Sequence, residues 1–276
     1  MSRVYRALEK AESRKGQGTE EESILRIFDD GNPDYAQERV SRSIEERVKK
    51  VNFPAGNGSP LIIPSPHSYS LEQFRKVKAR ILRQTPVPHS ILITSTVPGE
   101  GKSVVAFNLA LSFAQERHIR TILVDADLRK PSIFPEFPSE GLSEYLTGQS
   151  SWEETLIRIE DQNLYVIPAG KPSEKAPELL GSPKMKELLK HLLEWGEETY
   201  VFIDAPPILV TAEPLIFSNL VEGIVMVVMS DLAPRRSVRK ALESINKEKI
   251  LGVVFNQINL KPSRQYPARY YGYGRK

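Results

Sequence analysis

Short apolar runs recur between residues 90 and 255 and alternate with longer segments of helical periodicity. The runs are Ser90–Thr94, Thr121–Val124, Leu164–Ile167, Tyr200–Ile203, Gly223–Val228 and Ile250–Phe255. The helical segments include Ser103–Gln115, Met185–Leu193 and Arg235–Ile245. Strands without alternating polar residues are buried on both faces, which is typical of a parallel sheet between helices. The sequence therefore predicts an α/β fold with a doubly wound, mostly parallel sheet flanked by helices, in which ligands bind at the carboxyl ends of the strands.

Composition divides the chain into three regions. Residues 1–65 mix charged helical stretches with breaker-rich segments such as Pro54–Pro60, and we expect an N-terminal helical and linker region. Residues 66–260 contain the predicted α/β domain. Residues 261–276 carry five Lys or Arg, no Asp or Glu, two prolines and two glycines, and this composition predicts a tail that is disordered on its own.

Composition also excludes several classes of function. The 276 residues contain no cysteine, which excludes disulfides, thiolate metal sites and a catalytic thiol. The basic excess lies in the tail, so we expect no nucleic-acid partner for the α/β domain. No apolar stretch approaches the roughly 20 residues that span a bilayer, and residues 1–15 lack the apolar core of a signal peptide, so we expect a cytoplasmic protein.

A glycine-rich loop lies between the apolar run that ends at Thr94 and the helical segment that starts at Ser103. Such a loop presents backbone N–H groups and a helix N-terminus to phosphates. Lys102 is expected to reach the β- and γ-phosphates, and the Ser103 hydroxyl is expected to bind Mg²⁺. Thr96 replaces the first glycine of the G-x-x-x-x-G-K-[ST] pattern. The predicted nucleotide-binding residues are Pro98, Gly99, Glu100, Gly101, Lys102, Ser103 and Val104.

Carboxylates follow two other apolar runs. Asp125 and Asp127 begin an Asp-x-Asp-x-Arg segment that ends at Arg129, and Asp204 follows Ile203. Acids at the carboxyl ends of parallel strands share a sheet edge with the glycine loop, where Asp204 would hold Mg²⁺ directly or through a bound water. The alternative for either acid alone is a helix N-cap.

These motifs, in their order, resemble the bacterial tyrosine autokinases (BY-kinases) of capsular and exopolysaccharide biosynthesis. The resemblance covers residues 66–276 and rests on Thr96–Ser103, Val124–Pro131, Ile203–Pro207 and the tyrosine-rich C-terminus. It implies a P-loop NTPase fold shared with the partition and septum ATPases, with ATP and Mg²⁺ as cofactors. Those ATPases carry a lysine early in the loop, where this chain has Val97 and Pro98, and its absence favours the kinase branch.

The resemblance implies roles for individual residues. Asp125 would orient the tyrosine hydroxyl and finally accept its proton, and Arg129 would hold Asp127 or phosphate oxygens. Asn256 would touch the adenine, with capping of the following turn as the alternative. The implied catalytic residues are Lys102, Asp125, Asp127, Arg129 and Asp204. The implied metal-binding residues are Ser103, Asp125 and Asp204.

Two further groups of residues are implied. The phosphate acceptors would be four tyrosines of the tail, namely Tyr266, Tyr270, Tyr271 and Tyr273. A Glu-x-x-Arg-x-x-Lys pattern formed by Glu72, Arg75 and Lys78 would assemble subunits into a ring. Lysine stands where family members have a second arginine and cannot form a bidentate ion pair, and a solvated charged helix face is the alternative.

The sequence is therefore interpreted as an ATP-dependent tyrosine autokinase that phosphorylates its tail between subunits of an oligomer and regulates exopolysaccharide or capsule polymerisation and export. The expected partners are a membrane polysaccharide co-polymerase that activates the kinase and a cognate tyrosine phosphatase. The co-polymerase would hold the protein at the inner face of the membrane. The alternatives are a switch ATPase that transfers nothing to tyrosine, and a non-enzymatic protein whose tail binds a membrane or RNA.

Overall fold

The computed structural model describes residues 44–51, 69–131, 133, 140–160, 162–196 and 198–257. The chain divides into two compact units, Met1–Arg47 and Val48–Lys276, and the sheet belongs to the second. The four tail tyrosines proposed as acceptors lie outside the described residues. No helix within the described ranges is long and apolar enough to cross a bilayer.

Eight strands form one sheet, in the order β1-β4-β5-β3-β6-β2-β7-β8. Every neighbouring pair is parallel except β4 and β5, which are antiparallel. The strands are β1 (Lys49–Val51), β2 (Ser90–Ser95), β3 (Arg120–Asp125), β4 (Ile157–Ile159), β5 (Leu164–Ile167), β6 (Thr199–Asp204), β7 (Gly223–Met229) and β8 (Ile250–Asn256). The doubly wound, mostly parallel sheet predicted from the apolar runs is confirmed. β1 comes from within residues 1–65, which the sequence assigned to the N-terminal region.

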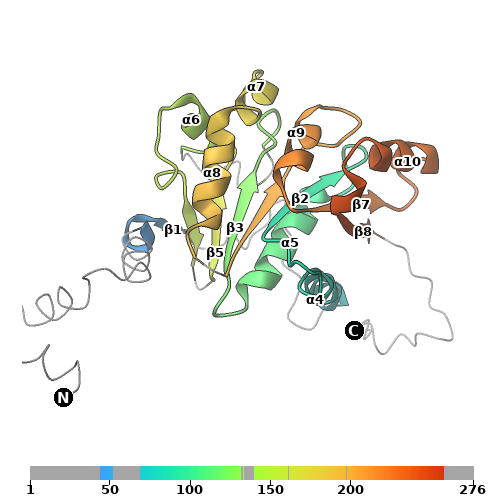
Figure 1. The fold of residues 1–276 in the computed structure, drawn as a ribbon, viewed down its shortest axis with the longest axis horizontal. Coiled ribbons are helices and arrows are strands. Elements are labelled where there is room, and N and C mark those ends of the chain that lie inside the picture. The colour runs from blue at the N-terminus through green and yellow to red at the C-terminus, as the bar shows by residue number, and fades with distance from the viewer. Residues whose placement is uncertain are drawn as a thin grey trace, which may run out of the picture. The chain divides into compact units, whose positions relative to one another are not determined.

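Helices cover both faces of this sheet. Helix α5 packs against α4 and against β3, β6 and β2 in a core centred on Phe107 and Phe113. Helix α8 contacts β6 and helix α9 contacts β2, and Figure 1 shows both helices across the near side of the sheet. The helices are α4 (Tyr69–Ile81), α5 (Lys102–Ala114), α6 (Leu142–Thr147), α7 (Ala176–Leu180), α8 (Pro183–Leu193), α9 (Glu213–Leu220) and α10 (Arg235–Glu243), with a 3₁₀ turn η1 (Lys247–Lys249).

The register of the central strands brings three loops to one edge of the sheet. Asp125 at the end of β3 is paired with Asp204 at the end of β6, and Asp204 is paired in turn with Ile93 of β2. Backbone hydrogen bonds extend these pairings beyond the strands, from Ala126 N to Asp204 O at 2.8 Å and from Ala205 N to Ile93 O at 3.0 Å. The loops after β2, β3 and β6 therefore start side by side.

Candidate functional site

The loop between β2 and α5 has the backbone of an anion cradle. Gly99 and Gly101 have φ angles of 87° and 84°, a region that strongly favours glycine. Gly101 is the N-cap of α5, and no side chain caps the helix. The first N–H groups of a helix have no intrahelical acceptor, so those of Lys102, Ser103 and Val104 suit phosphate oxygens. Pro98 lies exposed at the outside of the loop.

A buried carboxylate fixes this loop from inside. Glu100 Oε2 accepts hydrogen bonds from the backbone N–H groups of Thr96 at 2.6 Å and Val97 at 2.9 Å. Glu100 Oε1 accepts one from Met229 N, at the end of β7, at 3.3 Å. The side chain is fully buried. Glu100 was predicted among the nucleotide-binding residues, and the structure places its side chain within the protein, where it ties the loop to β7.

Asn256, at the end of β8, supports the same loop. Its Nδ2 donates to Glu100 O at 2.9 Å, and its Oδ1 accepts from Gln257 N at 3.0 Å. A Cβ at Gly101 would collide with the Asn256 amide, so the loop and the end of β8 approach closely at this glycine. The Asn256 amide contacts the loop backbone and the following turn, and its contact with the adenine stays a prediction.

Lys102 joins the three loops. Its Nζ lies 3.2 Å from Asp127 Oδ2 and 3.5 Å from Asp204 Oδ2, and it donates to Ser103 Oγ at 3.3 Å. Burial opposes the charge of the ammonium, but the surrounding carboxylates, led by that of Asp204, raise the pKa of Lys102 above its ordinary value. The lysine is therefore held as a cation among carboxylates from two other loops.

The two carboxylates at the strand ends are fully buried side by side. Asp125 Oδ1 accepts from Asp127 N at 3.1 Å, and its Oδ2 accepts from Ile133 N at 2.9 Å. Burial, followed by the neighbouring charge of Asp204, raises the pKa of Asp125 to about 7. Burial likewise raises the pKa of Asp204, although Lys102 opposes this shift.

The donors present fit a Mg²⁺ ion that shares its ligands with a nucleotide. Asp204 Oδ1 is buried and has no hydrogen-bond partner within the described ranges. Such an oxygen is costly unless a ligand satisfies it. No three His, Cys, Asp or Glu side chains in those ranges form a complete cation site. Mg²⁺ usually takes one or two carboxylates together with phosphates and waters, so the predicted ligands Ser103, Asp125 and Asp204 suit this mode.

Arg129 differs from its expected position. Its Nε donates to Glu213 Oε1 at 3.0 Å, at the start of α9, and no ion pair joins it to Asp127. Asp127 instead accepts from Lys130 N at 3.1 Å and pairs with Lys102. Of the two roles expected for Arg129, the contact with Asp127 is not formed, because the fully buried Glu213 carboxylate takes the guanidinium, and the contact with phosphate oxygens stays a prediction. In this structure Arg129 links the Asp-x-Asp-x-Arg loop to α9.

The three charged residues of the α4 pattern do not act together in the structure. Glu72 and Arg75 form an ion pair of 3.5 Å with about half of each side chain exposed. Lys78 instead reaches α5 and the turn after it, where its Nζ donates to Ser112 O at 2.9 Å and to Glu116 Oε1 at 2.7 Å. The Lys78 side chain is only 11% exposed. Glu72 and Arg75 remain available for a subunit contact, whereas Lys78 holds α4 on α5 within the chain.

Glu100→Ala is expected to weaken nucleotide binding at least tenfold and to lower the free energy of unfolding by at least about 3 kcal/mol. It leaves three backbone N–H groups without the acceptor that Glu100 supplies, and each such loss costs about 1–3 kcal/mol when the group stays buried. Titration with a fluorescent ATP analogue and urea unfolding measure the two effects. Glu187→Ala, which removes an exposed carboxylate on α8, is the control, and equal affinity of the two variants would contradict the role given to Glu100.

The ligand-free chain is expected to lose stability as the pH rises from about 5 to about 7. Folded Asp125 keeps its proton until about pH 7, whereas the unfolded carboxyl releases it near pH 4. The folded state binds more protons in this window, so the free energy of unfolding falls by about 1 kcal/mol per pH unit and levels off above pH 7. Urea unfolding without Mg²⁺ checks this slope, which should largely disappear in Asp125→Asn. The same slope in both proteins would contradict the assignment.

Known proteins resemble both the sequence and the fold. Residues 86–268 match the ParA family, described as NUBPL iron-transfer P-loop NTPase. The tyrosine-protein kinase YwqD of Bacillus subtilis (strain 168) is 35% identical over 222 residues, which cover 77% of this chain and 90% of YwqD. The succinoglycan biosynthesis transport protein ExoP of Rhizobium meliloti (strain 1021) is 32% identical over 75% of this chain and 27% of ExoP. The crystal structure of the chimerical protein CapA2B2 has 31% identity and a TM-score of 0.66, over 80% of this chain and 99% of that chain.

Proposed function

Because the chain belongs to the bacterial tyrosine kinases, within the ParA family of P-loop NTPases, we propose that it transfers the γ-phosphate of ATP to the four tyrosines of its C-terminal segment 261–276. The observation that carries the proposal is the position of Lys102, whose ammonium meets carboxylates from the loops after β3 and β6. The loop after β2 supplies the cation and the backbone donors, and the loops after β3 and β6 supply the acids, that phosphoryl transfer uses.

Charge stabilisation is the main contribution of these residues to the transfer. The N–H groups at the start of α5 and the ammonium of Lys102 stabilise the charge on the transferred phosphoryl group. Glu100 and Asn256 hold the loop in place from below, so the donors need not reorganise during the reaction. Mg²⁺, held by Ser103, Asp204 and Asp125 together with the phosphates, would neutralise further phosphate charge when bound.

The proton of the tyrosine hydroxyl is assigned to Asp125. Moving a proton from a phenol with a pKa near 10 to an ordinary carboxylate with a pKa near 4 costs about 8 kcal/mol. Burial raises the pKa of Asp125 in the ligand-free chain, which reduces this cost. A dissociative transition state needs the nucleophile oriented more than ionised, so this proton moves late. Asp127, bound to Lys102, fixes the position of the ammonium beside it.

The relatives support a proposal for the biological setting. ExoP is named for succinoglycan biosynthesis and transport, and this chain matches only about a quarter of its length. We therefore place this kinase in exopolysaccharide or capsule production, with a membrane polysaccharide co-polymerase as its activator and a tyrosine phosphatase acting against it. The co-polymerase would keep the kinase at the inner face of the membrane, and Glu72 and Arg75 would contribute to a ring of subunits.

Mapping of phosphotyrosine by mass spectrometry tests the acceptor assignment. After incubation with ATP and Mg²⁺, phosphate is expected on Tyr266, Tyr270, Tyr271 and Tyr273. A variant with all four replaced by phenylalanine is expected to lose at least nine tenths of the incorporated phosphate. Phosphate on tyrosines of the α/β domain, with none in segment 261–276, would overturn the assignment.

A mixing experiment tests transfer between subunits. Lys102→Met keeps the acceptors but loses the phosphate-binding cation, whereas the four-phenylalanine variant keeps the site but lacks acceptors. Phosphotyrosine on Lys102→Met in the mixture, and none on either protein alone, is the result expected for transfer in trans. An unlabelled Lys102→Met in the mixture would show that each chain modifies only its own tail.

A further inference from the structure

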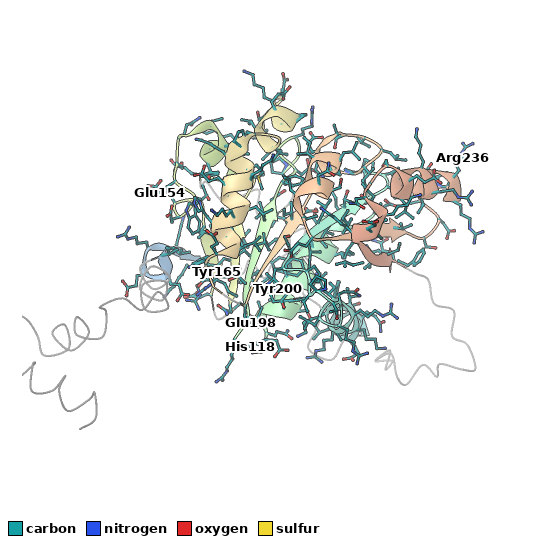
Figure 2. All side chains as sticks on the ribbon, in the orientation of Figure 1. His118, Glu154, Tyr165, Glu198, Tyr200 and Arg236 are labelled. Atoms are coloured by element: carbon teal, nitrogen blue, oxygen red, sulfur yellow. The ribbon has the colours of Figure 1, made fainter. Side chains whose placement is uncertain are left out.

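Helix α10 carries a cluster of exposed cations. Arg235, Arg236, Arg239 and Lys240 lie at positions separated by three and four residues, so they share one side of the helix. All four are exposed, and Figure 2 labels Arg236 at the outer edge of the molecule. None of them forms an ion pair with another described residue. We call these four side chains the α10 basic surface.

Phe255 of β8 is an exposed aromatic side chain on the same face of the sheet as α10. On β8, Val253 is 36% and Phe255 is 62% exposed. Val254 between them packs into the core on the α5 side, so Val253 and Phe255 point from the opposite face. The chain moves along the sheet in one direction from β2 through α5 to β3, and in the other direction from β7 through α10 to β8. Because both crossovers are right-handed, α10 lies on the face of the sheet opposite α5, which is the face of Val253 and Phe255. Figure 1 shows α10 at the same end of the sheet as β7 and β8.

The C-terminal segment starts beside this surface. Ser230 N donates to Asn256 O at 3.3 Å, so the chain leaves β8 next to the loop that leads into α10. The five residues from Ser230 to Arg235 span at most about 17 Å, and the nine from Gln257 to Tyr266 span up to about 30 Å. Every tail tyrosine is therefore connected by enough chain to reach the α10 basic surface of its own subunit.

Phosphorylation would make the tail complementary to this surface. The unmodified segment 261–276 carries five Lys or Arg and no acid, so the cations of α10 repel it. Each phosphotyrosine adds about −1.5 to −2, and four add roughly −6 to −8, which reverses the sign. Guanidinium groups bind phosphate oxygens in bidentate pairs, and an aromatic ring is an apolar partner for the ring of phosphotyrosine.

We propose that the α10 basic surface, together with Val253 and Phe255, is a docking site for the chain's own C-terminal segment once its tyrosines are phosphorylated. The inference rests on the proposed function for the modification itself. Docking holds the product tail on the outside of the β7–β8 end of the sheet. A product tail held on α10 does not occupy the nucleotide loop, which is then free for an unmodified acceptor.

Binding of synthetic peptides to the full unmodified chain tests the docking site whether or not the kinase modifies itself. The probe is residues 261–276 with all four tyrosines phosphorylated, followed by fluorescence anisotropy. We expect binding that weakens as salt is raised, at least tenfold weaker binding for the unphosphorylated peptide, and about tenfold weaker binding for Arg236→Gln/Arg239→Gln. The matched control is Lys186→Gln/Lys190→Gln on α8, which should bind within twofold of the unmodified sequence.

A second arm tests docking within one chain. Protein phosphorylated to completion should bind the phosphopeptide at least fivefold more weakly than unmodified protein, because its own tail occupies the surface, and Phe255→Ser should weaken binding severalfold. Equal phosphopeptide affinity of the two double variants would overturn the proposal, as would equal affinity for the two peptides. Vesicles with 30% phosphatidylserine are the last arm. If the arginine pair is needed for vesicles but not for the phosphopeptide, the surface is a membrane contact and the proposal is wrong.

Discussion

Asp204→Asn is expected to raise the thermal stability of the ligand-free chain at pH 8 while abolishing tyrosine phosphorylation. Burial raises the pKa of this carboxyl, so its ionised form costs folding free energy at any pH well above 4. Asparagine removes the charge beside Asp125 and preserves the volume. A gain of about 1 kcal/mol corresponds to a rise in Tm of about 2–4 °C for a domain of this size.

Catalysis is expected to fall because asparagine is a poor ligand for Mg²⁺ at Asp204 Oδ1, a buried oxygen without a hydrogen-bond partner among the described residues. Calorimetry with and without ATP and Mg²⁺ separates the two effects. Without ligands the variant should have a higher Tm than the unmodified protein, and ATP with Mg²⁺ should raise that Tm only slightly. Glu154→Gln, an exposed carboxylate far along the sequence, is the control for loss of one negative charge. A fall in Tm of Asp204→Asn at pH 8, with activity retained, would contradict the account of Asp204.

Lys102→Met is expected to lower the stability of the ligand-free chain, unlike Asp204→Asn, and to lower the activity, as Asp204→Asn does. It leaves Asp127 and Asp204 without their cation in a buried site, and breaking such a pair typically costs about 3–5 kcal/mol. It also removes a donor to the transferred phosphoryl group, so the rate of tyrosine phosphorylation should fall by about a thousandfold or more. Urea unfolding and initial rates with labelled ATP measure the two losses.

The order of ligand-free stabilities tests the site more strictly than the loss of activity does. Asp204→Asn should be more stable than the unmodified protein, and Lys102→Met should be less stable. The double variant Lys102→Met/Asp204→Asn should recover part of the lost stability, because it removes a charge that lacks its partner. Lys186→Met on α8 controls for loss of a lysine charge and should change neither quantity measurably. A Lys102→Met protein as stable as the unmodified one would mean that the carboxylates do not depend on the lysine.

The sheet could be predicted wherever strands are buried on both faces. Each of β2, β3, β5, β6, β7 and β8 coincides within one residue at either end with an apolar run. β1 and β4 have three residues each, and they begin or alternate with charged side chains, so no apolar run marks them. The pairing of β1 with β4 depends on a contact between distant segments, whereas the antiparallel pairing of β4 with β5 joins strands that are neighbours along the chain. The helices α6, α7 and α9 are too short to show a clear period.

The site was predictable to the extent that it follows from strand order. Residues that end parallel strands share an edge, and this places Lys102, Asp125 and Asp204 together without knowledge of side-chain positions. Partners chosen by tertiary packing could not be foreseen. Glu213, which binds Arg129, sits in the first turn of a helix, where acids are common for local reasons. Likewise, nothing in the spacing of α4 shows that Lys78 turns toward α5.

The fate of the γ-phosphate in a single turnover tests the central claim most directly. Full-length protein in excess over γ-labelled ATP and Mg²⁺ is quenched at intervals, and the label is divided between protein-bound phosphotyrosine and inorganic phosphate. We expect most of the label to become phosphotyrosine in segment 261–276, and none to do so in Lys102→Met. Release of the label as inorganic phosphate, with no phosphotyrosine formed, would identify a switch ATPase and contradict the account.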